Sequence, residues 1–411
     1  MTADSGGAGQ KVRSALRRCV PIPADDFAER HWDRTPLLSR RADDYTDLLD
    51  LDDVDELLSR RALRTPFVRM ARQGKVIPAA RYTGGGGPGA EVGDQVLDER
   101  VFEQLAGGAT LVLQGLHRLW PPLVDLAGDL GRELGVPVQV NAYLTPPGNQ
   151  GFATHYDTHA VFVLQVAGTK RWRVHPPVVP DPVERQPWGG RAEEVAAVAA
   201  GEPHLDAVLE PGDSLYLPRG WLHAAGALDD WSLHLTIGLR APTRLSVVEA
   251  LLDLAADAPA LRAGLPMGAD PGDGSAIAPL LADTVKALHE WLDTLRPDEV
   301  ADRWRRGRGA GARPAPLRPV AQAAALARLA AGDRVRLRPG LRIQVTEPDP
   351  GHVAIAAPDR TVTMPAVCVA AVRALLDGRA HAIADLPGLS TDDGVVLARR
   401  LLTETILVLD L

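Results

Sequence analysis

Two histidines and one aspartate are of the right types to bind a metal together. His155 and Asp157 lie two positions apart in ThrHisTyrAspThrHis (154–159), and His223 ends LeuProArgGlyTrpLeuHis (217–223). Two imidazoles and one carboxylate are the ligands of the 2-His-1-carboxylate triad. This triad holds Fe(II) on one face and leaves positions open for O2 and an organic co-substrate. A HisXAsp pair also arises by chance on surfaces and in cores, so the surrounding residues must decide.

The spacing of these residues is compatible with one site on a curled sheet. If residues 153–158 are extended, His155 and Asp157 point to the same face, because strand side chains alternate. His223 must then come from a distant strand. Residues 213–223 predict such a strand, ending in a Pro/Gly turn that delivers the histidine.

Lys170 is the second unexpected residue. The chain has four lysines among its 45 basic residues, so its basic positions are usually arginine. A lysine soon after His155, on an apolar strand, therefore calls for an explanation. A compact ammonium group on a flexible stem can pair with a carboxylate inside a narrow pocket. The alternative is a solvated lysine at a strand edge.

Composition limits the classes of protein to consider. The 411 residues suffice for two or three domains, and the net charge of −8 gives no global basic field for nucleic acid. Cys19 and Cys368 lie far apart and predict no disulfide framework, which favours a reducing compartment. No apolar run approaches the ~20 residues of a membrane span. The first residues lack a signal-peptide core, so we expect a cytoplasmic protein without a membrane partner.

The middle of the chain is rich in short strands. Strand patterns cover 136–144, 160–166, 170–174, 214–217 and 233–239, and AlaGlyThr at 167–169 predicts a hairpin. This density of strands with Gly/Pro turns indicates a barrel or jelly roll. Before it, helical patterns cover parts of 24–60, then 98–107 and 119–134, with a short strand at 110–114.

The C-terminal part has a different texture. Residues 243–296 are helical, and 303–319 form a basic stretch rich in Gly and Pro. That stretch could contact RNA phosphates, but a solvated tether is the favoured interpretation. From 320 onward, helices alternate with strands in the pattern of a small α+β domain with winged-helix content. Its last helix offers no strong DNA-reading face, so no direct DNA binding is expected.

Three long segments resemble the JmjC-type ribosomal oxygenases of the cupin superfamily. They are 27–38, 138–174 and 210–223, and the strand 233–242 matches as well. The resemblance implies a mainly β catalytic domain with a double-stranded β-helix (the cupin/JmjC jelly roll) over 1–242, including N-terminal helices. It further implies a helical dimerisation segment over 243–300, a basic linker over 301–319 and a winged-helix-like domain over 320–411.

Carried over residue by residue, the resemblance makes His155, Asp157 and His223 the iron ligands. Lys170 matches the residue that grips the distal carboxylate of 2-oxoglutarate. Asn141 and Tyr143 lie on the strand that lines the co-substrate pocket, and Thr236 is a weaker candidate for the same pocket. Inside a barrel, Asn and Tyr side chains often only satisfy core hydrogen bonds, and this interpretation stays open.

The resemblance implies an Fe(II)- and 2-oxoglutarate-dependent dioxygenase that uses O2 to hydroxylate a His or Arg side chain of a ribosomal protein, and that forms a homodimer. Two alternatives remain. The same chemistry could act on a small molecule or a biosynthetic peptide, or the barrel could be a non-enzymatic metal-binding module. Lys170 argues against the second alternative, since simple metal binding would not require it.

Overall fold

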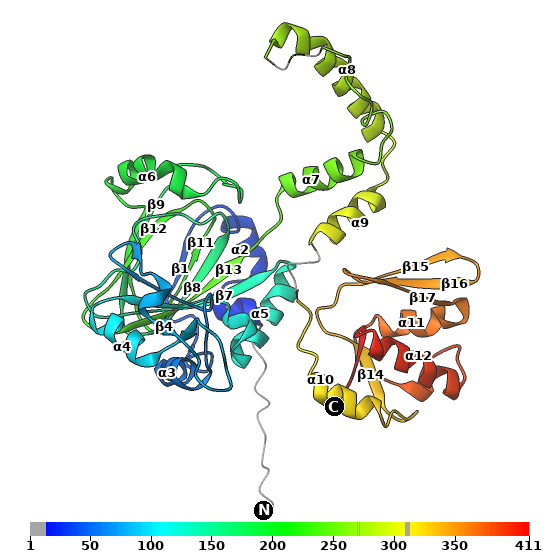
Figure 1. Cartoon of the computed structure of the whole chain (residues 1–411), viewed down its shortest axis with the longest axis horizontal. Helices are drawn as coiled ribbons and strands as arrows, with labels where there is room; N and C mark the ends of the chain where they lie inside the picture. Colours follow the sequence, from blue (N-terminus) through cyan, green and yellow to red (C-terminus); the bar gives the residue numbers. More distant parts are fainter. Residues whose placement is uncertain (1–13, 269, 271, 309–312, 411) are drawn as a thin grey trace, which may run out of the picture. The chain divides into compact units, whose positions relative to one another are not determined.

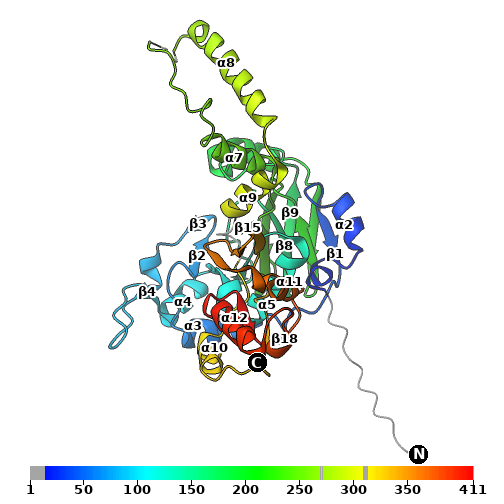
Figure 2. The ribbon, with the colours of Figure 1, turned by 90° about the vertical axis from the view of Figure 1, so that its right-hand side faces the viewer.

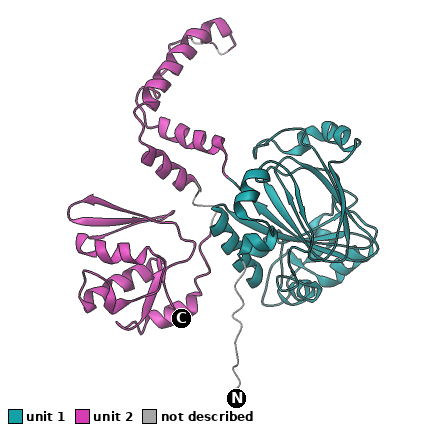
Figure 3. Ribbon diagram, turned by 180° about the vertical axis from the view of Figure 1, so that it is seen from behind, with its two compact units in different colours: residues 1–241 teal, residues 242–411 magenta. Residues whose placement is uncertain are grey.

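A computed structural model describes residues 14–268, 270, 272–308 and 313–410. The chain divides into two compact units, Met1–Ala241 and Pro242–Leu411 (Figure 3). Each unit is described by itself. No helix in the described ranges is long and apolar enough to cross a membrane.

Two antiparallel sheets form the centre of unit 1 (Figure 1). The larger has the strand order β1-β11-β8-β13-β7-β6-β2-β3 and the smaller the order β10-β9-β12. The strands of the larger sheet are β1 (Leu37–Ser39), β2 (Val68–Arg72), β3 (Lys75–Val76), β6 (Thr110–Leu113), β7 (Val138–Thr145), β8 (Ala160–Ala167), β11 (Ser214–Leu217) and β13 (Ser232–Leu239). Those of the smaller sheet are β9 (Lys170–His175), β10 (Leu205–Leu209) and β12 (Leu222–Ala227), and β4 (Thr83–Gly84) pairs with β5 (Gln95–Val96) separately. The prediction that this part of the chain is mainly β is confirmed.

Strand β8 shows why the central sequence is so apolar. Phe162 and Leu164 belong to the main core of unit 1, which also includes residues of the N-terminal helices. Val161 and Val163, on the opposite face, pack with Trp172 and other residues of the smaller sheet. A strand covered on both faces needs an apolar residue at nearly every position.

The turn at 167–169 differs from its prediction. A hairpin was expected, but β8 pairs with β11 and β13, whereas β9 pairs with β10 and β12. The turn therefore carries the chain from one sheet to the other. Gly168 has a φ of +60°, and a Cβ there would lie 1.9 Å from the carbonyl oxygen of Trp231. Only glycine fits this crossing.

Helices surround the sheets of unit 1. They are α1 (Ala15–Cys19), α2 (Ala24–Arg30), α3 (Leu51–Arg60), α4 (Asp98–Ala106), α5 (Pro121–Leu134) and α6 (Ala192–Ala199), with short 3-10 turns at Ala79–Arg81, Leu116–Arg118 and Trp188–Arg191. A capping box starts α3, where Asp50 and Asp53 each bond the other's backbone N–H. Leu123, Leu126 and Leu130 of α5 are buried at helical spacing.

Unit 2 begins with α7 (Arg244–Ala255), α8 (Gly274–Leu292) and α9 (Pro297–Arg308). Helices α7 and α9 lie side by side (Figures 1 and 2), and Arg303 pairs with Asp257 at 2.8 Å. The expected linker over 301–319 is therefore wrong at its start, since 301–308 belong to α9. Asp298 and Glu299 favour this helix because acidic side chains stabilise a first turn. Residues 309–312 of that expected linker lie outside the described residues.

The rest of unit 2 combines helices with two small sheets. Its elements are α10 (Pro319–Leu326), β14 (Arg334–Leu337), β15 (Gln344–Asp349), β16 (His352–Ala356), β17 (Thr361–Pro365), α11 (Val369–Leu375), β18 (His381–Ala382), α12 (Thr391–Thr403) and β19 (Leu407–Leu409), with 3-10 turns at Ala366–Cys368 and Ile383–Asp385. The sheets have the orders β18-β14-β19 and β15-β16-β17. Val335, Ile355, Val372 and Leu401 are among the residues of their shared core.

Candidate metal centre and co-substrate pocket

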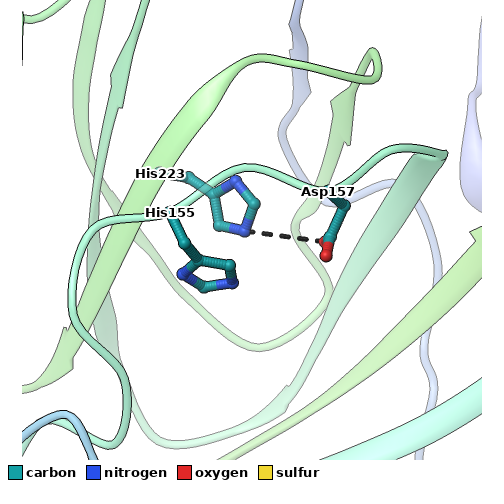
Figure 4. Close-up of side chains that lie close together, drawn as sticks. All are labelled: His155, Asp157 and His223. Atoms are coloured by element: carbon teal, nitrogen blue, oxygen red, sulfur yellow. Dashed lines mark ion pairs between the residues drawn. The ribbon is translucent and has the colours of Figure 1, made fainter. Parts of the chain in front are cut away.

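The three predicted ligands meet at one point of unit 1 (Figure 4). His223 lies near the start of β12, as the Pro/Gly turn suggested. The expected strand over 153–158 is absent, and His155 and Asp157 lie in an irregular connection between β7 and β8. Backbone bonds replace the strand. The N–H of His223 donates to the carbonyl of His155 (2.8 Å), and the N–H of Gly220 donates to that of Asp157 (2.9 Å).

The ligand atoms are close enough to share one ion. One donor atom from each of the three residues lies within 4.8 Å of the others. His223 Nε2 is 3.9 Å from Asp157 Oδ2 (Figure 4), and the two imidazole centroids are 4.5 Å apart. The side chain of His223 is buried, while those of His155 and Asp157 are half-buried. A small contraction would bring all three donors to the distances of about 2.0–2.3 Å seen in metal sites.

The protein fixes which nitrogen of each histidine faces the site. His155 Nδ1 lies 2.8 Å from the carbonyl oxygen of Ala153, and His223 Nδ1 lies 3.1 Å from that of Trp221. A carbonyl can only accept, so each Nδ1 carries the hydrogen. The lone pair of each Nε2 is then free for a metal. Metal-binding histidines are commonly oriented in this way by a partner on the other ring nitrogen.

The charges of the site suit a cation. Burial and the neighbouring His155 lower the pKa of His223 to about 4, although Asp157 opposes them. His223 is therefore neutral at neutral pH and keeps its lone pair. Burial works against ionisation of Asp157, but His223, His159 and His155 outweigh it and lower the pKa of this carboxyl. The site thus offers the neutral imidazole of His223, the imidazole of His155 and the carboxylate of Asp157.

A cavity of about 300 Å³ extends from the triad into unit 1. It reaches Lys170, whose side chain comes from the start of β9 and is only 3% exposed. The ammonium donates to Thr145 Oγ1 (2.8 Å), which also accepts from Thr110 Oγ1 (3.1 Å). Among the described residues no carboxylate pairs with Lys170, and burial lowers its pKa to about 7. A buried ammonium without a counter-ion is costly, so a carboxylate ligand would be strongly favoured here.

The other predicted pocket residues divide into two groups. Tyr143 and Thr236 line the cavity, and burial raises the pKa of Tyr143 to about 12. Asn141 pairs with Thr236 across β7 and β13, but its Oδ1 accepts from the N–H of Gly115 (3.0 Å). Asn141 is not among the lining residues. Its side chain thus satisfies a backbone N–H group. This agrees with the alternative interpretation of Asn141, in which it satisfies a core hydrogen bond.

Several residues in or beside the cavity were not predicted. His234 stacks on Tyr143 with centroids 5.0 Å apart, and Thr145 bonds Lys170. Both could have been found by period-two alternation, from Thr236 and from Tyr143. Arg69 on β2 also lines the cavity, with its guanidinium 5.2 Å from the centre of the Phe152 ring. Arg69 precedes the site by more than 80 residues, and no local pattern singles it out.

The segment 176–204 lies at the metal end of the cavity. Its Trp188 lines the cavity, with its ring centre 6.2 Å from that of His155. Tyr156 anchors the segment, because its hydroxyl donates to the carbonyl of Gln186 (2.9 Å). Tyr156, Val195 and Leu222 form a small apolar cluster with Trp188 and its neighbours.

Residues 128–247, which contain the whole triad and Lys170, match the JmjC domain family. Among curated relatives, ribosomal oxygenase 1 of Homo sapiens is 34% identical over 251 residues, 58% of this chain and 36% of that protein. The bifunctional lysine-specific demethylase and histidyl-hydroxylase NO66 of Aedes aegypti is 31% identical over 230 residues, 53% of this chain and 33% of that protein. The chain thus spans about a third of the length of these relatives.

Solved structures extend the likeness in fold to nearly the whole chain. Escherichia coli YcfD covers 95% of this chain and 98% of its own, with a TM-score of 0.58 at 20% identity. The structure of YcfD, described as a ribosomal oxygenase in complex with cobalt and 2-oxoglutarate, has a TM-score of 0.54 at 19% identity. The cupin-type fold and the resemblance to JmjC ribosomal oxygenases are confirmed.

Proposed function

We propose that this protein is an Fe(II)- and 2-oxoglutarate-dependent oxygenase that hydroxylates a His or Arg side chain of a ribosomal protein. The observation that carries the proposal is the buried ammonium of Lys170 in the same cavity as the triad. A metal-binding module would gain nothing from that group. An enzyme that binds a dicarboxylate needs it, because one carboxylate must be neutralised away from the metal.

In this proposal His155, Asp157 and His223 hold the metal through two Nε2 atoms and a carboxylate oxygen. Bound iron would supply the activation of O2 and the coupled decarboxylation of 2-oxoglutarate to succinate and CO2. The protein's own task is orientation. Lys170, held in place by its hydrogen bond to Thr145, fixes the distal carboxylate, and the aromatic rings of Tyr143, Trp172 and Trp188 exclude water around the reacting atoms.

The proposed substrate class rests on the names of the relatives and on the extent of the likeness in fold. The human relative is named a ribosomal oxygenase, and the insect relative is named a bifunctional lysine-specific demethylase and histidyl-hydroxylase. The fold likeness to E. coli YcfD reaches through both units and not only the barrel. A small substrate enclosed by the barrel would not require unit 2, whereas a protein substrate can use it. Location in the cytoplasm, where ribosomes work, belongs to the same proposal.

We further propose that the helices within 243–300 pair two chains into a homodimer, and that 320–411 form a winged-helix-like domain. Helix α8 has no buried residue, and Leu252, Leu281 and Val285 on α7 and α8 are exposed. Exposed apolar side chains gathered on neighbouring helices usually mark an interface. Light scattering on a size-exclusion column tests this, and a monomer at micromolar concentration would refute the dimer.

Mass spectrometry of ribosomal proteins tests the substrate class. Cells with the gene should carry one added oxygen atom on a His or Arg residue of one ribosomal protein, and cells without the gene should lack it. Complementation with the Asp157→Ala variant should not restore the modification. If no ribosomal protein changes while the purified enzyme consumes 2-oxoglutarate with a peptide or metabolite, the small-substrate alternative replaces the proposal.

A further inference from the structure

A stretch of unit 2 is strongly basic although the whole chain is acidic. Residues 303–342 contain eleven arginines and a single acidic residue, Asp333, whereas Asp and Glu together make up 53 of the 411 residues of the chain. The general preference of this chain for arginine explains why the basic residues of this stretch are arginines. It does not explain why Asp and Glu are scarce here, because they are frequent in the rest of the chain. The structure describes the part of this stretch from Arg313 onward and its helical beginning up to Arg308.

Arg334 and Arg336 alternate with apolar residues along β14, and Arg338 follows directly after the strand ends at Leu337. Val335 is buried in the core of unit 2, and Leu337 packs against that core. By alternation Arg334 and Arg336 point to the opposite face. The N–H of Arg338 donates to the carbonyl of Ile406 (3.0 Å), which extends the ladder by one residue and keeps Arg338 in the same row. Residues two apart on a strand are about 6.6 Å from each other.

Arg313 extends this row beyond the strand. The N–H of Ala315 donates to the carbonyl of Pro339 (2.8 Å), and Arg338 Nε donates to the carbonyl of Ala315 (2.9 Å). These bonds hold Arg313 near the end of β14. Burial, and then the charge of Arg313, lower the pKa of Arg338. We call Arg313, Arg334, Arg336 and Arg338 the arginine row.

The arginine row has little internal neutralisation. Arg336 Nε lies 3.4 Å from Asp410 Oδ1, and within the described ranges this is the one carboxylate that pairs with the row. Arg334 and Arg338 instead donate to the carbonyls of Ala380 and Ala315, which orient the guanidinium groups without cancelling their charge. Like charges held side by side destabilise the free protein, and an anionic partner would relieve that repulsion.

We propose that the arginine row binds the phosphate backbone of single-stranded RNA. A row of charges at regular intervals matches a polymer with one negative charge per repeat. The guanidinium fork pairs with phosphate oxygens through two parallel hydrogen bonds. The choice of RNA as the polyanion rests on the proposed function, because a ribosomal protein is surrounded by RNA. The charge pattern itself is independent of the oxygenase activity.

Fluorescence anisotropy with a labelled oligouridine and the full-length protein tests the proposal. The variant Arg313→Gln/Arg334→Gln/Arg336→Gln removes three charges and leaves the Arg338 bond to Ala315 intact. Its affinity should fall about tenfold or more at moderate salt, and the slope of log K against log salt should become shallower by about two. Replacement of the same three residues by Lys should keep most of the affinity. Retained affinity in the Lys variant would show that the Gln variant loses affinity through its missing charges and not through misfolding.

A matched control removes three exposed arginines of unit 2 outside the row, Arg244, Arg262 and Arg296. This variant has the same net charge as the test variant and should bind like the wild type. Equal losses in both variants would overturn the proposal, as would the absence of salt-dependent binding in the wild type. Competition by polyglutamate as strong as that by oligouridine would point to an acidic protein instead, and tighter binding of duplex DNA would exclude RNA as the preferred partner. All these measurements can be made with the Asp157→Ala variant too, so a failure of the oxygenase proposal would leave them unchanged.

Discussion

The two ends of the cavity in unit 1 are built in different ways. At the metal end, His155 and Asp157 lie in an irregular connection, where His155 exchanges two backbone hydrogen bonds with His223 and the carbonyl of Asp157 accepts one from Gly220. At the closed end, Lys170, Thr145 and Thr110 project from three regular strands and are almost completely buried. The first end holds its groups by local hydrogen bonds, which leaves room for exchangeable ligands. The closed end keeps the ammonium group of Lys170 inside the core. This buried charge lowers the stability of the fold and provides a binding position for a carboxylate.

The largest effect should come from the metal end. Asp157→Ala removes the only anionic ligand of the triad, and we expect it to abolish metal binding and turnover, with a loss of at least about a thousandfold, comparable to removal of a group essential to catalysis. The half-buried side chain carries no core packing, so the unfolding temperature should change little. Calorimetric titration with Mn(II) measures the binding, and Asp229→Ala, an exposed carboxylate on the β12–β13 turn, serves as control. Full Mn(II) affinity in Asp157→Ala would show that the triad does not bind the metal.

At the closed end, Lys170→Met should separate function from stability. Without the ammonium the affinity for 2-oxoglutarate should fall roughly ten- to hundredfold, as expected for a hydrogen bond to a charged group of about 1.5–3 kcal/mol. The ligand-free variant should nevertheless unfold at a higher temperature than the wild type, because Met fills the space without a buried charge. Lys75→Met, an exposed lysine on β3, should change neither quantity. A destabilised variant with normal 2-oxoglutarate affinity would contradict both parts.

The pH dependence of co-substrate binding follows from the same lysine. The pKa of Lys170 is about 7 in the free protein, and a bound carboxylate would raise it. Affinity for 2-oxoglutarate is then full below pH 7 and falls by up to about tenfold per pH unit above it, until the pKa of the bound state is reached. Titrations of the Mn(II)-loaded protein with 2-oxoglutarate between pH 6 and pH 9 should show this decline in affinity, beginning near the pKa of Lys170 in the free protein. Lys170→Met should bind weakly with a flat profile, and a wild-type affinity that rises with pH would have the wrong sign.

The smallest effect is expected from Thr145→Val. The substitution keeps the shape of the side chain and removes the hydroxyl that accepts from Lys170. The loss of one hydrogen bond of about 0.5–1.5 kcal/mol should weaken 2-oxoglutarate binding about two- to tenfold and leave Mn(II) affinity unchanged. Thr346→Val, an exposed threonine on β15, is the matched control. If Mn(II) affinity fell as well, the two ends of the cavity would not be separable in the way described.

The contrast between the two ends also explains what could be predicted from the sequence. Strands β7, β8, β9, β11 and β13 were predicted because buried strands need apolar side chains. Strand β12, LeuHisAlaAlaGlyAla, has small residues instead and pairs through its backbone with β9, so its pattern is weak. Strand β10 was missed for a related reason, since it is short and half-exposed at the edge of the smaller sheet.

Single side chains were harder to predict than strands. The face that carries Asn141 and Tyr143 was predictable from alternation, but the bond from Gly115 to Asn141 depends on a turn whose path no local pattern specifies. The prediction of a hairpin at 167–169 was wrong because the AlaGlyThr pattern indicates only that the chain reverses direction. It does not indicate which sheet the next strand joins. Arg69 illustrates the general limit, since only the tertiary fold brings β2 to the cavity.

The most direct test is a crystal structure of the protein with Mn(II) and 2-oxoglutarate bound. The account predicts one ion within about 2.0–2.3 Å of His155, Asp157 and His223. We also expect one carboxylate of 2-oxoglutarate to lie within hydrogen-bond distance of Lys170 Nζ. A bound ion that leaves any of the three ligands unused, or a co-substrate whose carboxylate avoids Lys170, would contradict it.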